Sequence, residues 1–141
     1  MAVKHRYSIV CDDVRREDNG KLMLVGVYGG TIVVPQFPAV LPTLTIFSVF
    51  DTDRPESSPF TLTIQRLENG QGLAQVQGFA NIAQPGMGVI PFKFSQMPFQ
   101  EAGTYSAVLQ ISNAEPIVVV DFEVALPPQG FGLPQNPFQR R

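Results

Sequence analysis

Apolar and polar residues alternate with a period of two along most of the chain, which is the pattern of half-buried β-strands. The alternation is clearest near residue 60, where Phe60, Leu62 and Ile64 share one face and two threonines and a glutamine share the other. No window of 11 or more residues shows the apolar stripe of an amphipathic helix. Eight strands are therefore predicted, at residues 5–12, 21–28, 43–50, 60–65, 76–82, 90–94, 103–112 and 117–125, with a short extended piece at 31–34.

Turn residues separate these strands and suggest where two of them lie. Asn19-Gly20 is a strong signal for a tight hairpin between the first two strands. Residues 21–28 are apolar on both faces apart from Lys21, which predicts a central strand. Pro91 interrupts the segment 90–94 and predicts an edge position or a bulge there. The predicted fold is all-β, an antiparallel sandwich of about eight strands in the immunoglobulin-like style.

The composition changes near residue 127. Residues 1–126 are expected to form one sandwich domain, which suits the length of the chain. Residues 127–141 are rich in Pro, Gly and Gln and cannot form a regular ladder, so a flexible tail is expected. Phe131 and Phe138 in this tail could dock on the domain or on a neighbouring chain.

Charge and targeting signals restrict the partners. The net charge is −2, with ten basic and twelve acidic residues, so a basic nucleic-acid-binding surface is not expected. No apolar run approaches the ~18 residues of a membrane span, and the first apolar stretch is too short for a signal-peptide core. We expect a cytoplasmic protein that binds neither nucleic acid nor membrane.

The segment 101–107 resembles the corner motif of immunoglobulin-like sandwiches. Glu101, Gly103 and Tyr105 occupy its acid, small and tyrosine positions, and Ala107 stands where antibody domains have a cysteine. In this motif the tyrosine hydroxyl fastens a sharp corner by bonding to the backbone. The chain also has no Trp, so the resemblance is to the sandwich and not to an antigen receptor.

A second resemblance extends over most of the domain. It comprises an opening strand, Cys11-Asp12-Asp13, the turn at residues 19–22, the segment 25–28, a Pro-rich crossover and the corner at residues 101–105. These features resemble a family of small uncharacterised bacterial proteins known as a domain of unknown function. The resemblance implies a bacterial cytoplasmic protein and supplies neither an activity nor site residues.

Groups for nucleophilic catalysis are scarce. His5 and Cys11 are the single His and the single Cys. Six residues apart on one strand, they are separated by roughly 20 Å and cannot form a catalytic pair. They also cannot supply the four ligands of a zinc site. Cys11 is expected in the core, His5 is expected to be exposed near the terminus, and no cofactor is expected.

Carboxylates give one candidate metal site. Asp12 and Asp13 are expected to end the first strand, and Asp51 and Asp53 the third. If these ends meet at one edge of the sandwich, the four carboxylates could bind Ca²⁺ through oxygen. Asp is also a common turn residue because its side chain caps nearby backbone, so the four residues have a purely structural interpretation as well.

Three hypotheses about function remain. The first is a non-catalytic protein that acts by protein–protein association, as a homo-oligomer or as an accessory subunit. A bacteriophage or prophage structural component belongs to this class by analogy of fold. The second is a Ca²⁺-dependent module for carbohydrate or lipid that uses the four aspartates. The third is a hydrolase built on carboxylates, and the first is preferred because dedicated catalytic groups are missing.

Overall fold

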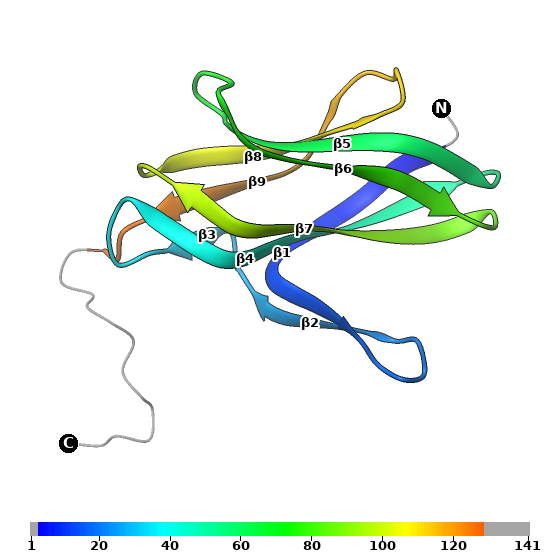
Figure 1. Ribbon diagram of the computed structural model, residues 1–141, viewed down its shortest axis with the longest axis horizontal. Coiled ribbons are helices and arrows are strands. Elements are labelled where there is room, and N and C mark those ends of the chain that lie inside the picture. The colour runs from blue at the N-terminus through cyan, green and yellow to red at the C-terminus, as the bar shows by residue number, and fades with distance from the viewer. Residues whose placement is uncertain (1–2, 129–141) are drawn as a thin grey trace.

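The computed structural model describes residues 3–128, and the regular structure in this range consists of β-strands (Figure 1). The predicted all-β sandwich is confirmed, with nine strands instead of about eight because the short extended piece pairs as β3. No helix between these residues is long and apolar enough to cross a bilayer. Most of the predicted tail, from residue 129 onward, lies outside the described residues. The strands are β1 Val3–Arg16, β2 Leu22–Val27, β3 Thr31–Val33, β4 Ala39–Thr52, β5 Glu56–Arg66, β6 Gly72–Ile82, β7 Gly86–Phe99, β8 Gly103–Ile111 and β9 Ile117–Ala125.

The strands form two sheets. The first has the order β2-β1-β4-β7 and the second the order β3-β9-β8-β5-β6. Neighbouring strands are antiparallel apart from β3 and β9, which run parallel. This parallel pair differs from the prediction, and it arises because the chain leaves the first sheet after β2 and joins the second sheet beside its last strand.

The main core lies between the sheets. Phe92 and Phe94 of β7 face it while Lys93 points outward, as the period-two pattern predicts. The ring of Phe92 meets that of Phe60 from β5 edge to face, at 4.9 Å between centroids. Aromatic residues from both sheets therefore fill the space between the layers.

A second, smaller core lies on the outer face of the first sheet. Phe47 and Val49 of β4 pack there with Cys11 of β1. The β1–β2 hairpin bends out of the plane of the first sheet and lies over part of this cluster (Figure 1). Strand β4 is therefore buried on both faces, which is the property that the sequence had suggested for residues 21–28. The covering side chains are Ile9, Val14, Leu22 and Leu24.

The structure settles the two predictions about strand position. Strand β7 lies at the edge of the first sheet, so the edge position inferred from Pro91 is confirmed. The prediction of a central strand at residues 21–28 is wrong, because β2 is the opposite edge strand and pairs with β1. One apolar face of β2 packs against the second core, and the other apolar face is exposed to solvent.

Candidate functional site

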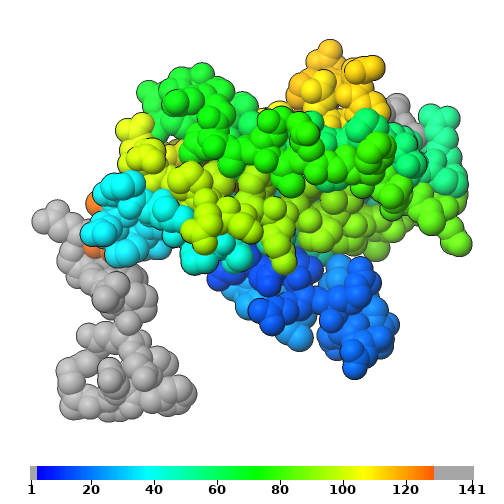
Figure 2. Space-filling model, in the orientation of Figure 1, coloured from blue at the N-terminus to red at the C-terminus, as the bar shows by residue number. Residues whose placement is uncertain are grey.

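The β1–β2 hairpin forms a separate projection from the sandwich, visible as the dark-blue lobe below the body in Figure 2. The N–H of Glu17 donates to the carbonyl of Lys21 at 2.8 Å and closes its turn. The outward side chains of Met23, Val25 and Val27 are 50%, 39% and 57% exposed. Three apolar side chains at alternate positions of one short edge strand thus face solvent.

A hydrogen-bonded group holds the base of the hairpin. The Tyr28 hydroxyl donates to the Asp12 carboxylate at 2.5 Å, and the Thr45 hydroxyl donates to the Asp12 carbonyl at 3.2 Å. Gly26 has a φ of +68°, and a Cβ there would lie 2.2 Å from Asp12 Oδ2. Burial, followed by the bond to Asp12, raises the pKa of Tyr28, so the phenol is a neutral donor at ordinary pH.

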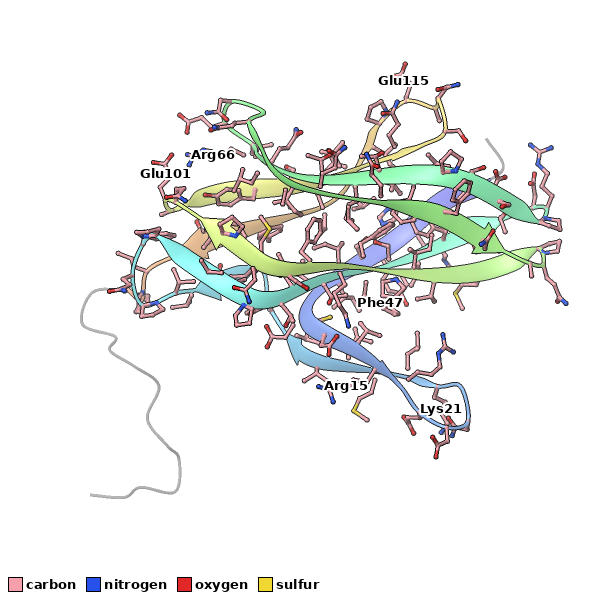
Figure 3. The ribbon with its side chains drawn as sticks, in the orientation of Figure 1. Arg15, Lys21, Phe47, Arg66, Glu101 and Glu115 are labelled. Carbon is pink, nitrogen blue, oxygen red and sulfur yellow. The ribbon has the colours of Figure 1, made fainter. Side chains whose placement is uncertain are left out.

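Asp13 ties the hairpin to the far edge of its own sheet. Its carboxylate lies 2.6 Å from Nζ of Lys93 on β7 and 3.2 Å from Nε of Arg15. The hydrogen bond from Lys93 is the main reason why the pKa of Asp13 is lowered. In Figure 3, Arg15 and Lys21 lie on the projecting hairpin and Phe47 lies where the hairpin leaves the sheet. The projection is thus held by apolar packing, hydrogen bonds and an ion pair.

The structure does not bring the four candidate calcium ligands together. Asp12 and Asp13 lie within β1 instead of at its end. In the β1–β4 ladder Lys4 faces Asp51, and Asp12 lies eight residues further along β1. That separation is roughly 26 Å at about 3.3 Å per residue. Asp51 and Asp53 are therefore at the opposite end of the ladder, and the expectation of one shared edge is wrong.

Each of the two distant aspartates lies beside an arginine. Asp51 Oδ2 lies 3.4 Å from Nε of Arg6, and Asp53 Oδ1 lies 3.8 Å from Nε of Arg54. In the described part of the chain, no three His, Cys, Asp or Glu side chains come together as a metal site would require. The aspartates serve as local ion-pair partners in this arrangement.

The predicted corner is formed by the named residues. The Tyr105 hydroxyl donates to the Glu101 carbonyl at 2.5 Å, which is the bond that the motif requires. The Tyr105 ring is buried and meets Phe99 edge to face at 4.9 Å. Arg66 pairs with the Glu101 carboxylate, and both lie at one corner in Figure 3. The Arg66 guanidinium lies 3.4 Å from where a Cβ of Gly103 would be, so this glycine leaves room for the pair.

The two residues considered for nucleophilic chemistry are packing residues. Cys11 is fully buried, as expected, and burial raises its thiol pKa. His5 is half buried instead of exposed, with its ring edge-on to Phe50 at 5.5 Å. Its Nε2 lies 2.8 Å from the Ser8 hydroxyl, and burial lowers the pKa of the imidazole.

The exposed face of β2 was missed by the sequence-based reasoning. Residues 22–27 contain no charge and no proline. The absence of charge and proline does not distinguish a central strand from an edge strand that lacks protecting residues. The sequence does carry one signal for an edge strand, which is the short length of the segment. Gly20 on one side and Gly29-Gly30 on the other limit β2 to six residues, and the hairpin turn pairs it with β1 alone.

Two solved structures align with most of this chain at low sequence identity. A β-glucosidase from Erythrobacter marinus has 10% identity and a TM-score of 0.49 over 86% of this chain, and the chain spans 15% of that enzyme. The C-terminal domain of wzt has 11% identity and a TM-score of 0.51, over 87% of this chain and 73% of that domain. At this identity the second likeness shows the fold alone.

The family is defined by sequence. Curated proteins give no match to the chain. A family model does match, and it spans residues 6–125, which include all of β2 to β9 and most of β1. The chain therefore belongs to the family of unknown function DUF6941.

Proposed function

We propose that this protein acts by binding another protein chain through the β1–β2 hairpin, and that it is not an enzyme. The observation that carries this proposal is the edge strand β2, which is uncharged and exposes Met23, Val25 and Val27. Soluble proteins usually protect an edge strand with charges, proline, a covering loop or a very short length. A homo-oligomer and an accessory subunit of a larger assembly would both use this surface.

The charged groups support a binding role over catalysis. A hydrolase built on carboxylates needs two carboxyl groups with different surroundings near one cleft. Here Asp13, Asp51 and Asp53 each have a basic neighbour on the surface. The hollow beside Glu56 is lined by that single carboxylate. The separation of the aspartates likewise gives the calcium hypothesis no geometric support within residues 3–128.

The architecture adds a weaker argument. The Tyr105 corner and the two-sheet order support an immunoglobulin-like description of the sandwich. Many domains of this architecture bind other proteins, which is an analogy at the level of fold.

The test compares two surface substitutions by size-exclusion chromatography with light scattering, on purified protein and on extract of the source cells. Val25→Lys adds a charge to β2, and Val118→Lys makes the same change at a 55% exposed valine of β9. We expect wild-type chain and the Val118 variant to elute in a species larger than 15.5 kDa, and the Val25 variant to elute as the monomer. A wild-type monomer in both samples would contradict the proposal.

A further inference from the structure

The outer face of the second sheet carries no charged side chain across three neighbouring strands. Residues 57–65 of β5, 72–82 of β6 and 104–111 of β8 contain no Asp, Glu, Lys or Arg. Soluble domains average about 25% charged residues, most of them on the surface. Both cores lie on other faces of the sheets, so this face is open to solvent within residues 3–128. Because charged residues are depleted at the centre of binding surfaces, a face of this size without charge favours an uncharged partner.

Amides and hydroxyls occupy the outward positions at the centre of this face. Thr61 lies opposite Gln77 of β6 and Gln110 of β8, and Thr63 lies opposite Gln75. These five residues are named the amide face, and each of their side chains can both donate and accept a hydrogen bond. Gln75 and Gln77 are exposed, so their amides face solvent. Such groups match the hydroxyls of a neutral ligand, whereas a phosphate or carboxylate ligand would be bound more strongly by cations.

Three shallow hollows follow one another along the β5–β6 ladder. The first lies beside Ser57 and Asn81 and has a volume of about 420 Å³. The second lies beside Phe79 and has about 400 Å³, and the third lies beside Thr63 and Gln75 and has about 300 Å³. Since Ser57 faces Asn81 and Thr63 faces Gln75 across the ladder, the row extends over roughly 20 Å at about 3.3 Å per residue. The row suits an extended ligand that lies along the strands.

An exposed aromatic ring lies at the middle hollow. Phe79 is 66% exposed, lines the second hollow and lies opposite Pro59 of β5. The face of an aromatic ring carries partial negative charge, so it attracts the C–H groups on one side of a sugar ring. The turns at residues 67–71 and 112–116 form the green and gold lobes at the top of Figure 2, with a lower stretch of surface between them. The Ser112 N–H donates to the Pro59 carbonyl at 2.8 Å, which places the second turn beside β5.

We infer that this face binds an extended neutral glycan, whose hydroxyls bond to the amide face and one of whose sugar rings stacks on Phe79. The charges at the two ends of β5 are engaged, since Glu56 accepts from the Ser58 hydroxyl and Arg66 pairs with Glu101. A nucleic acid, which needs cations along its backbone, does not fit this surface. The glycan site lies on the second sheet and the β1–β2 hairpin on the first, so the inference is independent of the proposed protein contact.

Binding of the purified full-length chain to a printed array of neutral and anionic oligosaccharides tests the inference. Gln77→Glu keeps the size of the side chain but replaces the amide donors with a charge, and Gln36→Glu makes the same change in the exposed loop between β3 and β4. Phe79→Ala removes the ring, and Met87→Ala is its control at a 63% exposed methionine of β7. We expect the wild-type chain to bind extended neutral glycans in preference to anionic ones.

Gln77→Glu and Phe79→Ala should each weaken binding to the best neutral glycan at least roughly fivefold, and the two controls should bind as the wild type does. Matching urea midpoints would show that the variants are folded. No binding to a neutral glycan, binding that neither site variant weakens, or a preference for anionic glycans would each overturn the inference. Binding to a parallel peptide array alone would do the same, because the face would then dock a protein. Val25→Lys should bind glycan as the wild type does, which keeps this test separate from that of the hairpin.

Discussion

Removing one oxygen atom, by Tyr105→Phe, tests the corner that joins β7 to β8. The hydroxyl donates to the Glu101 carbonyl at 2.5 Å, and the ring is 1% exposed. The substitution deletes this bond and leaves the ring in place against Phe99. Tyr105→Ala removes the ring as well, so the two variants separate the hydrogen bond from the packing.

The two substitutions are expected to lower the free energy of unfolding by amounts that differ severalfold. A single hydrogen bond contributes about 0.5–1.5 kcal/mol to the free energy of unfolding, so Tyr105→Phe should cost about 1 kcal/mol. Truncating a buried aromatic side chain to alanine costs about 3–5 kcal/mol, and this value applies to Tyr105→Ala. In a domain of this size, 1 kcal/mol lowers Tm by roughly 3–5 °C.

Urea unfolding followed by far-UV circular dichroism measures both costs, with Tyr7→Phe as the control. Tyr7 is 48% exposed on the outer face of the first sheet, and surface changes of this kind usually stay within about 0.5 kcal/mol. An unchanged m-value would show that the variants still unfold from a similar native state. If Tyr105→Phe is as stable as wild type, the hydroxyl does not fasten the corner and the reasoning is refuted.

Three further predictions concern the base of the hairpin. Gly26→Ala should lower stability by about 1–2 kcal/mol or more, because a left-handed backbone conformation is unfavourable for alanine and its Cβ would collide with Asp12; Gly29→Ala is the control, and equal urea midpoints would contradict the argument. Because the folded-state pKa of Asp13 is lowered, the contribution of its carboxylate to stability is present above the unfolded-state pKa near 3.8 and is lost as pH falls through the folded-state pKa. Urea midpoints of Asp13→Asn should thus fall less steeply in acid than those of wild type, and parallel acid profiles would refute this. The raised pKa of Tyr28 has the opposite effect on the pH dependence of stability. The stabilising contribution of the phenol is present below its unfolded pKa near 10 and is lost as pH rises through the folded pKa. Tyr28→Phe should therefore show a shallower alkaline loss of stability, and an unchanged slope above pH 10 would disprove it.

Local pattern was sufficient for much of the fold. The alternation that placed Phe92 inward and Lys93 outward depends on neighbouring residues of one strand, so it is legible without knowing the partner strands. The same holds for the turn at Gly20 and for the edge position of Pro91, since a proline lacks the N–H that a central strand requires. The corner residues around Tyr105 also lie within one short segment.

The candidate sites could not be derived in this way. Asp12 and Asp51 both seemed to lie at strand ends, but the antiparallel β1–β4 ladder separates them along its length. The apolar segment 22–27 fits a central strand and an exposed edge equally well. Only the pairing of β4 with both β1 and β7 leaves β2 at the margin.

The sequence by itself therefore determined the class of fold, the approximate strands and the inward side chains. The tertiary structure alone decided which strand became an edge, which carboxylates approached one another and which apolar face stayed exposed. The physical reason is the range of the interactions: side-chain alternation is set within a few residues, whereas strand order is set by hydrogen bonds and packing between segments far apart in the chain. The exposed face of β2 belongs to the second kind.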